Sequence, residues 1–564
     1  MLTISNLTVE FRGVGPVVKG ISISVGRGET VGLVGESGSG KSISSLSVMG
    51  LLPSTAKMSG SISFTKTDGT IVELAVSGNA YPEGIRGREI AMIFQEPMTA
   101  LNPTIRCGEQ VDEMMRENLG YSRQQAKECT LQLFDEVLLP DPEKAYRSYP
   151  HELSGGQRQR VMIAMAISCN PQLLIADEPT TALDVTVQKE ILELLKQLRN
   201  RYGMGLIFIS HDLRIVAEVC ERIVVMRHGD LVEQGKSDDV FHHPQHPYTK
   251  ALVSCLPPID ARPERLLTVK EFTEQENASI TFQNNTERSN QHKQLYAQVP
   301  LLKVSNLDAG YSFGGSIFSK TRKFFKAVKQ VGFEVYPGET FGLVGESGCG
   351  KTSLGRTLVG LVKSLSGSIE FEGKRIDKLK GEDLRRIRRD IQMIFQDPFS
   401  SLNPKITVGE AIMEPMRVHG VGRNEKDRLE RMNYLLKKVE LPLEVASRYP
   451  HEFSGGQRQR IVIARTLALE PKLIICDESV SALDVSVQAQ VLNLLNDLKK
   501  ELGLTYIFIS HDLSVVRYIS DRVMVMQKGQ IAELNEADEL YNHPKQEYTK
   551  KLIGAIPKSK SNPQ

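Results

Sequence analysis

Short, continuous apolar runs alternate along this chain with longer stretches in which apolar residues recur at helical spacing. Runs of the first kind are VGLV at 31–34, LLIA at 173–176 and GLIFIS at 205–210, and VQKEILELLKQLRNRY at 187–202 is of the second kind. Buried strands that alternate with helices are typical of an α/β fold, in which a mainly parallel sheet carries helices on its faces. We therefore predict that fold, with ligands at the carboxyl ends of the strands.

The chain repeats itself once. YPHELSGGQRQR at 149–160 returns as YPHEFSGGQRQR at 449–460, and IFISHDL at 207–213 returns unchanged at 507–513. Both offsets are 300 residues, far longer than the roughly 20 to 50 residues of a solenoid repeat. We predict two tandem domains, 1–259 and 301–564, which make the chain a pseudo-dimer.

Residues 260–300, between the two copies, are polar and lack apolar periodicity, as in TEQENASITFQNNTERSNQHKQ. A segment of this composition has few apolar residues to bury, and we predict a flexible linker. A flexible chain of this length spans roughly 35 Å on average, which is enough to let two domains face each other. The linker shows no long, basic helical pattern.

Composition narrows the class of protein. Lys and Arg number 70 against 68 Asp and Glu, and the formal net charge is +2. A protein that grips phosphate backbones by charge alone has a strong basic excess, so nucleic acid is not an expected partner. Seven cysteines are scattered without a C-x-x-C pair, which favours free thiols in a reducing compartment. No run of about 18 apolar residues is present to span a bilayer, so we expect any membrane role to come through a partner.

A glycine-rich motif follows a predicted strand in each half. It matches G-x-x-x-x-G-K-[ST] in the strand-to-helix context of a phosphate-binding loop. Backbone N–H groups and the positive helix end would hold the phosphates. Lys41 and Lys351 would contact the β- and γ-phosphates, and Ser42 and Thr352 would ligate Mg²⁺. The two loops consist of Gly35, Glu36, Ser37, Gly38, Ser39, Gly40, Lys41 and Ser42, and of Gly345, Glu346, Ser347, Gly348, Cys349, Gly350, Lys351 and Thr352.

Two adjacent acids end a later apolar strand in each half. Asp177 and Glu178 follow LLIA, and Asp477 and Glu478 follow LIIC. The carboxyl end of such a strand lies beside the phosphate loop of a parallel sheet. We predict that the first acid holds Mg²⁺ through water and that the second polarises the attacking water. ATP and Mg²⁺ are thus the expected cofactors.

Phosphate loops and Asp-Glu strands occur in many NTPases, so the family is identified by a further motif. LSGGQ at 153–157 and FSGGQ at 453–457 resemble the signature sequence of ABC proteins, and the resemblance covers nearly all of residues 1–260 and 300–560. In that family the signature forms a second anion nest, for the γ-phosphate. The residues so implied are Ser154, Gly155, Gly156, Gln157, Ser454, Gly455, Gly456 and Gln457.

The same resemblance assigns the other site residues. It implies Q-loop glutamines that sense Mg²⁺ and touch the transport partner, histidines that contact the γ-phosphate, D-loop aspartates, and aromatic residues that stack on adenine. The glutamines are Gln95 and Gln396, the histidines are His211 and His511, the D-loop aspartates are Asp184 and Asp484, and the aromatic residues are Phe11 and Tyr311.

Resemblance to ABC proteins also implies an architecture and a mechanism. Each P-loop NTPase domain would carry an antiparallel β subdomain and a helical signature subdomain. Each phosphate loop would pair with the signature of the other domain, so that ATP binding closes the two domains and hydrolysis reopens them. Because both halves keep their catalytic acids, we expect two competent sites rather than a nucleotide-binding scaffold.

The end of each half is similar to one branch of the family. HPQHPYT at 243–249 and HPKQEYT at 543–549 resemble the extension typical of oligopeptide, dipeptide and nickel importer ATPases. This implies a peripheral energy-coupling subunit on the cytoplasmic face of the inner plasma membrane, beneath two permease subunits that an extracytoplasmic substrate-binding protein feeds. Peptides are the default cargo, while nickel, metallophores, opines and glutathione stay open.

Two alternatives and two departures complete the sequence-based picture. One alternative is a tandem ABC protein that acts on ribosomes or DNA, which would have a long charged linker or long coiled-coil insertions. The other is that the histidines of HHPQHP bind a metal, although the C-terminal extension already explains them. Ser479 stands where the family usually has proline, and because proline fixes φ we expect an altered turn after Glu478. The second extension, with Lys545, Gln546 and Glu547, is expected to be degenerate.

Overall fold

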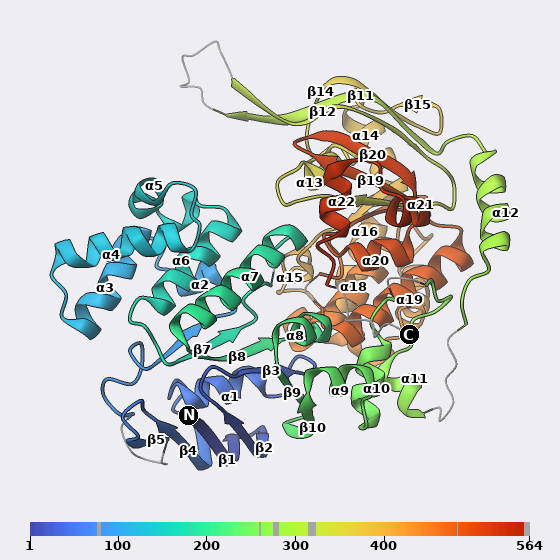
Figure 1. Cartoon of the computed structure of the whole chain (residues 1–564). Coiled ribbons are helices and arrows are strands. Elements are labelled where there is room, and N and C mark those ends of the chain that lie inside the picture. The colour runs from blue at the N-terminus through green and yellow to red at the C-terminus, as the bar shows by residue number, and fades with distance from the viewer. Residues whose placement is uncertain are drawn as a thin grey trace. The chain divides into compact units, whose positions relative to one another are not determined.

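The chain forms two compact units, one made chiefly of residues 1–253 and the other of residues 254–556. Figure 1 shows a sheet with helices on its faces in each of them. This computed structural model describes residues 1–75, 81–181, 183–258, 261–274, 281–313, 323–481 and 483–557. The predicted α/β class is confirmed.

The first unit contains two sheets. The larger has six strands in the order β10-β9-β3-β8-β7-β6, and its neighbours are parallel apart from β9 and β10. The smaller is antiparallel, in the order β2-β1-β4-β5. The strands are β1 (Leu2–Phe11), β2 (Gly15–Val25), β3 (Thr30–Val34), β4 (Ala56–Thr65), β5 (Ile71–Ala75), β6 (Ile90–Ile93), β7 (Leu173–Asp177), β8 (Gly205–Ser210), β9 (Arg222–Arg227) and β10 (Asp230–Lys236).

Helices of the first unit fall into two groups. Helices α3 to α6 pack on one another and form a helical subdomain that ends with the signature helix α6, while α8 packs on β3 and β8 of the larger sheet and α1 on its β7. The helices are α1 (Lys41–Val48), α2 (Pro97–Ala100), α3 (Cys107–Leu119), α4 (Arg123–Glu136), α5 (Pro142–Arg147), η1 (Pro150–Glu152), α6 (Gly155–Ile167), α7 (Val185–Tyr202), α8 (Leu213–Val219), α9 (Ser237–His242) and α10 (Pro247–Ser254).

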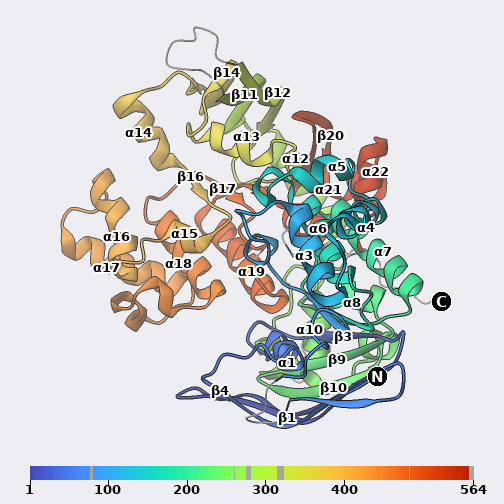
Figure 2. The same cartoon turned by 90° about the vertical axis from the view of Figure 1, so that its left-hand side faces the viewer.

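The second unit repeats this plan. Its sheets have the orders β16-β17-β18-β13-β19-β20 and β12-β11-β14-β15. Figure 2 shows its helices α16, α17 and α18 lying together at a distance from β11, β12 and β14. The strands are β11 (Leu302–Phe313), β12 (Lys323–Val335), β13 (Thr340–Val344), β14 (Ser364–Phe371), β15 (Lys374–Arg375), β16 (Ile391–Ile394), β17 (Leu473–Asp477), β18 (Thr505–Ile509), β19 (Arg522–Gln527) and β20 (Gln530–Glu536). The helices are α13 (Lys351–Leu358), α14 (Gly381–Asp390), α15 (Pro398–Ser401), α16 (Val408–His419), α17 (Glu425–Lys438), η2 (Leu443–Ser447), η3 (Pro450–Glu452), α18 (Gly455–Leu467), α19 (Val485–Leu502), α20 (Leu513–Ile519), α21 (Ala537–Asn542) and α22 (Glu547–Ile553).

One apolar cluster in each unit joins the two sheets. In the first unit Leu2 and Phe64 of the antiparallel sheet and Ile175 of the parallel sheet belong to the same buried cluster. Leu302 and Ile475 belong to the equivalent cluster of the second unit. Burial of this apolar surface fixes the antiparallel subdomain on the sheet that carries the phosphate loop. Both subdomains implied by the family resemblance are therefore present in each unit.

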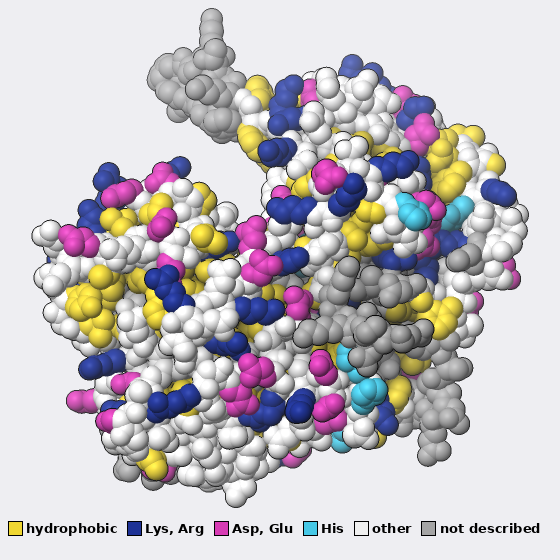
Figure 3. Space-filling model, in the orientation of Figure 1, with side chains coloured by type: hydrophobic (Ala, Val, Ile, Leu, Met, Phe, Trp, Pro, Cys, Tyr) yellow, Lys and Arg dark blue, Asp and Glu magenta, His cyan; other side chains and the backbone are white. Residues whose placement is uncertain are grey.

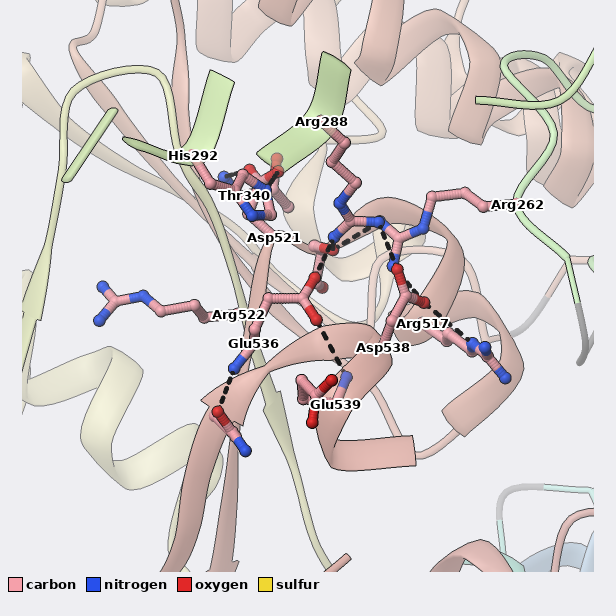
Figure 4. Close-up of polar contacts among 12 residues, drawn as sticks. Arg262, Arg288, His292, Thr340, Arg517, Asp521, Arg522, Glu536, Asp538 and Glu539 are labelled. Atoms are coloured by element: carbon pink, nitrogen blue, oxygen red, sulfur yellow. Dashed lines mark hydrogen bonds and ion pairs between the residues drawn. The ribbon is translucent and has the colours of Figure 1, made fainter. Parts of the chain in front are cut away.

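The segment expected to be a flexible linker differs from that expectation, because much of it is bound to the second unit. In its helix α12 (Asn285–Tyr296), Arg288 donates to Glu536 Oε1 at 2.8 Å and to Asp538 Oδ2 at 2.9 Å. His292 Nε2 lies 3.2 Å from Asp521 Oδ1. Figure 4 shows these side chains converging on the acids at the start of β19 and α21. We call Arg262, Arg288, His292, Asp521, Glu536 and Asp538 the linker cluster.

The earlier part of the segment is held in the same way. Arg262 donates to the carbonyl oxygen of Ser520 at 2.8 Å. Further along, before the short helix α11 (Val269–Glu274), the backbone N–H and C=O of Leu266 both bond to the side-chain amide of Asn493, at 3.0 and 2.7 Å. A polar composition predicts a flexible linker, but here arginine, histidine and asparagine side chains supply the attachment that apolar residues usually provide.

The surface agrees with the balanced composition. On the face drawn in Figure 3, basic and acidic side chains are interspersed rather than gathered into one field of a single sign.

Candidate functional site

The phosphate loop of the first unit joins β3 to α1 in a backbone conformation that requires glycine. Gly35 has φ 152° and Gly40, the N-cap of α1, has φ 99°. A Cβ atom at Gly35 would lie 2.2 Å from the carbonyl oxygen of Met226, so no larger residue fits. Gly345 of the second loop has φ 147° and the same 2.2 Å approach to Met526. The last two residues of each predicted loop are the first two of α1 and α13.

The loop lysines are buried and held inside their loops. Lys41 Nζ donates to the carbonyl oxygens of Gly35 and Glu36 at 2.7 and 2.8 Å. Lys351 Nζ makes the equivalent bonds at 2.6 and 3.0 Å. Each ammonium therefore lies where the loop wraps around it, which is the position needed to meet a phosphate oxygen.

Asp177 and Asp477 lie at the carboxyl ends of β7 and β17, close to the helix that follows each phosphate loop. Thr352 Oγ1 donates to Asp477 Oδ1 at 3.0 Å. In the first unit Asp177 is 4% exposed and its Oδ1 has no protein hydrogen-bond partner. Burial, with the charge of Glu178 adding to it, raises the pKa of Asp177 to about 6. A buried carboxylate with a free oxygen beside the Ser42 hydroxyl is a donor set that suits Mg²⁺.

Glu178 is the centre of the catalytic arrangement in the first unit. Its φ is 47°, a left-handed conformation that costs roughly 1 to 3 kcal/mol in a residue other than glycine, and its N–H is fixed by the carbonyl oxygen of Ile209 at 3.0 Å. Its Oε2 accepts hydrogen bonds from Gln95 Nε2 at 2.9 Å and Thr181 Oγ1 at 2.8 Å. His211 Nδ1 lies 3.4 Å from the same oxygen.

These contacts decide the charge of the pair. Burial by itself would raise the pKa of Glu178, but the hydrogen bond and charge of His211 outweigh it, and the pKa falls to about 2. For His211, burial lowers the pKa while the bond to Glu178 raises it, and the net change is upward. Glu178 is therefore ionised near neutral pH and able to accept a hydrogen bond from water. Thr181 was missed from the sequence because no motif points to it.

The second unit builds the same arrangement with one difference. Gln396 Nε2 donates to Glu478 Oε2 at 2.7 Å, and His511 Nδ1 lies 3.5 Å from that oxygen. Ser481, however, donates to the backbone oxygen of Glu478 at 2.9 Å rather than to its carboxylate. The predicted change of turn caused by Ser479 is wrong. Glu478 has φ 50°, and the turn bond from residue 481 to residue 478 is 3.3 Å, against 3.2 Å in the first unit.

The predicted adenine-stacking residues end or lie within the first strand of each antiparallel sheet. Phe11 is half-buried against the core of the first unit. Tyr311 is 42% exposed, and its hydroxyl lies 3.2 Å from Ser353 Oγ, one residue after the phosphate-loop threonine. An exposed ring beside the phosphate-loop helix is available to a base, and the stacking role stays a prediction.

The signature motifs form helix N-termini with complete caps. Ser154 accepts a hydrogen bond from Gln157 N at 3.3 Å, and Gln157 Oε1 accepts one from Ser154 N at 3.0 Å. Ser454 and Gln457 repeat this capping box. A Cβ atom at Gly156 would lie 2.7 Å from Val187 Cγ1, so the second glycine is needed for packing as well. The N–H groups at such a terminus suit an anion. That Gly155, Gly455 and Gly456 bind one stays a prediction.

The D-loop aspartates stand directly before the long helices. Asp484 is the N-cap of α19 and accepts hydrogen bonds from Val487 N at 3.0 Å and Ser486 Oγ at 3.1 Å. Asp184 occupies the corresponding place before α7. Asp484 thus has a structural role as a cap, whatever it contributes to nucleotide binding.

The second C-terminal extension is not degenerate in structure. In the first unit the carboxylate of Glu233 accepts the N–H groups of Gln245 and His246 at 2.8 and 3.1 Å. In the second, Glu533 accepts the N–H groups of Lys545 and Gln546 at 3.0 Å each. The side chains that differ between the halves are not part of these bonds, so the turn survives their replacement. His246 Nδ1 accepts the N–H of Tyr248 at 3.1 Å, which gives that histidine a place in the turn.

Comparison with known proteins identifies the family. The family model for ABC transporters matches residues 18–181 and 328–481, and that for the oligopeptide/dipeptide transporter C-terminal region matches residues 232–281 and 532–564. The chain is similar to proteins named glutathione import ATP-binding protein GsiA. The identity is 46% to that of Pectobacterium atrosepticum and 45% to that of Salmonella typhimurium, each over 99% of this chain and 89% of the relative.

Solved structures align with one half of the chain at a time. A component of an ABC transporter complex from Clostridium perfringens is 28% identical and covers 44% of this chain and 92% of its own, with a TM-score of 0.38. The double match to the transporter model and the full-length relatives agree with the two sets of phosphate loops, acids and signatures described above. The chain belongs to the ABC transporter family, as a tandem ATP-binding ATPase of the peptide-importer branch.

Proposed function

We propose that this chain powers the import of short peptides, with glutathione as the first cargo to test. The observation that carries the proposal is the pair of C-terminal regions that match the oligopeptide/dipeptide transporter model, one after each ATPase domain. The relatives named for glutathione import match the chain almost from end to end, and glutathione is itself a tripeptide. The proposed domains remain 1–259 and 301–564.

The proposed cofactors are ATP and Mg²⁺ at each phosphate loop. Ser42 and Asp177 would hold the cation in the first site, and Thr352 and Asp477 in the second, with Gln95 and Gln396 as further contacts. Bound Mg²⁺ would neutralise charge on the β- and γ-phosphates. Support comes from the buried Asp177 oxygen that has no protein partner and from the 3.0 Å bond between Thr352 and Asp477.

Glu178 and Glu478 are proposed as the groups that orient and polarise the attacking water. Each is ionised, each is held in a left-handed conformation, and each shares a carboxylate oxygen with a glutamine and a histidine. His211 and His511 would keep the carboxylates in place and contact the γ-phosphate. The shared histidine contact lowers the pKa of both glutamates, so neither needs to lose a proton before it accepts one from water.

Each site is proposed to be completed by the other domain. The signature of 454–456 would cap the nucleotide on Lys41, and that of 154–156 the nucleotide on Lys351. Bonds from both sides to one γ-phosphate would close the domains, and their loss on hydrolysis would reopen them. The capped N-termini of α6 and α18, with their free N–H groups, support this arrangement.

The proposed partners are two permease subunits in the membrane and an extracytoplasmic substrate-binding protein, with the chain peripheral on the cytoplasmic face of the inner membrane. Among the helices in the described parts of the chain, none is both long and apolar enough to cross a bilayer. We propose that the permease subunits receive the closing motion of the two domains.

The test is ATP hydrolysis by the chain reconstituted with its permease subunits and binding protein in lipid vesicles. We expect stimulation when glutathione or a dipeptide is present outside, and uptake of the same compound. A chain with Glu178→Gln and Glu478→Gln should bind ATP but neither hydrolyse it nor drive uptake. Hydrolysis that peptides do not stimulate, together with uptake of nickel instead, would overturn the proposed cargo but not the ATPase assignment.

A further inference from the structure

A tyrosine of each C-terminal extension reaches the phosphate loop of its own domain. Tyr248, in α10, is completely buried. Its hydroxyl accepts a hydrogen bond from the backbone N–H of Glu36, the second residue of the first phosphate loop, at 3.2 Å. These two residues are 212 positions apart in the chain, so only the tertiary structure brings them into contact.

The second domain makes the same contact independently. The hydroxyl of Tyr548, in α22, accepts a hydrogen bond from the N–H of Glu346 at 3.1 Å. The residues before Tyr548 differ from those before Tyr248, yet the turn that places the tyrosine is kept by Glu533, as Glu233 keeps it in the first domain. The contact is therefore preserved while the surrounding side chains change.

The bonded N–H belongs to a loop whose shape decides how it binds phosphate. Gly35 and Gly38, on either side of Glu36, have φ of 152° and 78°, conformations that a glycine leaves and enters easily. Glycine has no side chain to restrict its backbone, so a contact from elsewhere in the domain must keep Gly35 and Gly38 in one conformation. The hydroxyl of a buried tyrosine can do this, because the ring is itself held in place: the guanidinium of Arg227 lies over the Tyr248 ring, 4.8 Å from its centre.

We propose that Tyr248 and Tyr548 are positioning residues that hold the two phosphate loops in the shape that binds ATP. The C-terminal extension is thereby a part of the nucleotide site, which it supports from behind the loop without touching the nucleotide. This rests on the proposed function of the loops as ATP sites. Without the hydroxyl, the N–H of Glu36 loses this hydrogen bond and the loop has more conformations to give up when ATP binds.

The test replaces both tyrosines in the full-length chain with phenylalanine, Tyr248→Phe and Tyr548→Phe. This removes two hydroxyl groups and keeps both rings. We expect the dissociation constant for a fluorescent ATP analogue with Mg²⁺, and the KM for ATP, to rise about three- to tenfold, the equivalent of one ordinary hydrogen bond at each site. The kcat should change little, since no group at the reacting atoms is altered.

The matched control is Tyr506→Phe. Tyr506 is a buried tyrosine of β18 whose hydroxyl donates to the carbonyl oxygen of Leu495 at 3.2 Å. Its hydroxyl also bonds to the backbone, although as a donor, and makes no contact with the phosphate loop among those described. We expect it to lower the melting temperature as much as either extension variant and to leave ATP affinity unchanged.

A second test of the proposal is Glu533→Gln, which disturbs the turn that carries Tyr548 and should also raise the KM for ATP.

Two outcomes separate failure of this inference from failure of the proposed function. If the Tyr→Phe chain binds ATP as tightly as the unmodified chain, or loses affinity only in proportion to its melting temperature, the positioning role is overturned. If a chain with Lys41→Ala and Lys351→Ala binds ATP as tightly as the unmodified chain, the loops are not the ATP sites and the proposed function fails instead.

Discussion

Arg288 offers the sharpest test of how the linker is attached. Its side chain is 9% exposed and donates to Glu536, to Asp538 and to the carbonyl oxygen of Ser520. Arg288→Ala would remove all of these bonds at once and leave two acids without that partner. Loss of one member of a buried ion pair costs about 3 to 5 kcal/mol.

The exposure and the remaining contacts of the two acids lower the expected cost below about 3 to 5 kcal/mol. The two acids are 27% and 30% exposed, and Asp538 keeps weaker contacts with Arg262 at 3.5 Å and Arg517 at 3.3 Å. We therefore expect a loss of about 2 to 3 kcal/mol in the free energy of unfolding of the second domain. For a domain of this size that corresponds to roughly 4 to 12 °C in melting temperature.

The measurement is urea unfolding followed by hydrogen-exchange mass spectrometry of peptides from α20 and α21, because a two-domain chain has no single unfolding transition. Arg423→Ala is the control. Arg423 pairs with Asp427 at 2.8 Å but is 89% exposed, so its loss should cost at most about 0.5 kcal/mol. Equal effects of the two substitutions, or no effect of Arg288→Ala, would show that the linker is not bound as the structure describes.

Three other predictions concern single residues. Thr181→Ala should slow ATP hydrolysis several-fold more than Ser481→Ala, since only Thr181 bonds to the catalytic carboxylate; equal rates in a full-chain assay would refute this. Gly456→Ala should lower the melting temperature, because the new Cβ would lie 2.2 Å from Val487 Cγ1 and overpacking costs about 1 to 3 kcal/mol; an unchanged melting curve would count against it. The pKa of Asp521 is held well below its ordinary 3.8, since Lys499 and His292 outweigh burial, so the stability it adds is complete above about pH 4 and lost below it. In urea unfolding the difference between the unmodified chain and Asp521→Asn should be the same at pH 7 and pH 5 and smaller at pH 3.5, and a decrease already at pH 5 would contradict the assignment.

Much of each site could be predicted because its determinants are local. Gly35 and Asp177 lie at strand ends whose apolar runs are plain in the sequence, and Lys41 begins the helix after the first of these strands. The direction of a parallel sheet brings those strand ends together. The duplication then gave every prediction an independent second copy. Catalytic partners such as Gln95 and His211 came only from resemblance to a family, since nothing in their neighbouring residues indicates which carboxylate they meet.

The rest could not be predicted because it depends on contacts between distant residues. No local pattern shows that Tyr248 lies against Glu36, although the recurrence of Tyr-Thr at the same place in both halves was a usable signal. The unchanged turn after Ser479 was missed because hydrogen bonds to Ile509 and within the turn fix it without proline. The attachment of the linker could not be predicted, because the pattern of apolar residues does not reveal a segment that is held by charged side chains.

The linker cluster also decides where this polypeptide could be divided into two. A break just before residue 301 would assign Arg262, Arg288 and His292 to the first fragment. In the second fragment Glu536 would lose Arg288, Asp538 would lose Arg262 and Arg288 but keep Arg517, and Asp521 would lose His292 but keep Lys499. A break near residue 260 would keep the acids with the arginines that neutralise them. The second half of the chain is thus the longer of two unequal pieces, and a neutral spacer of equal length could not replace the linker at its start.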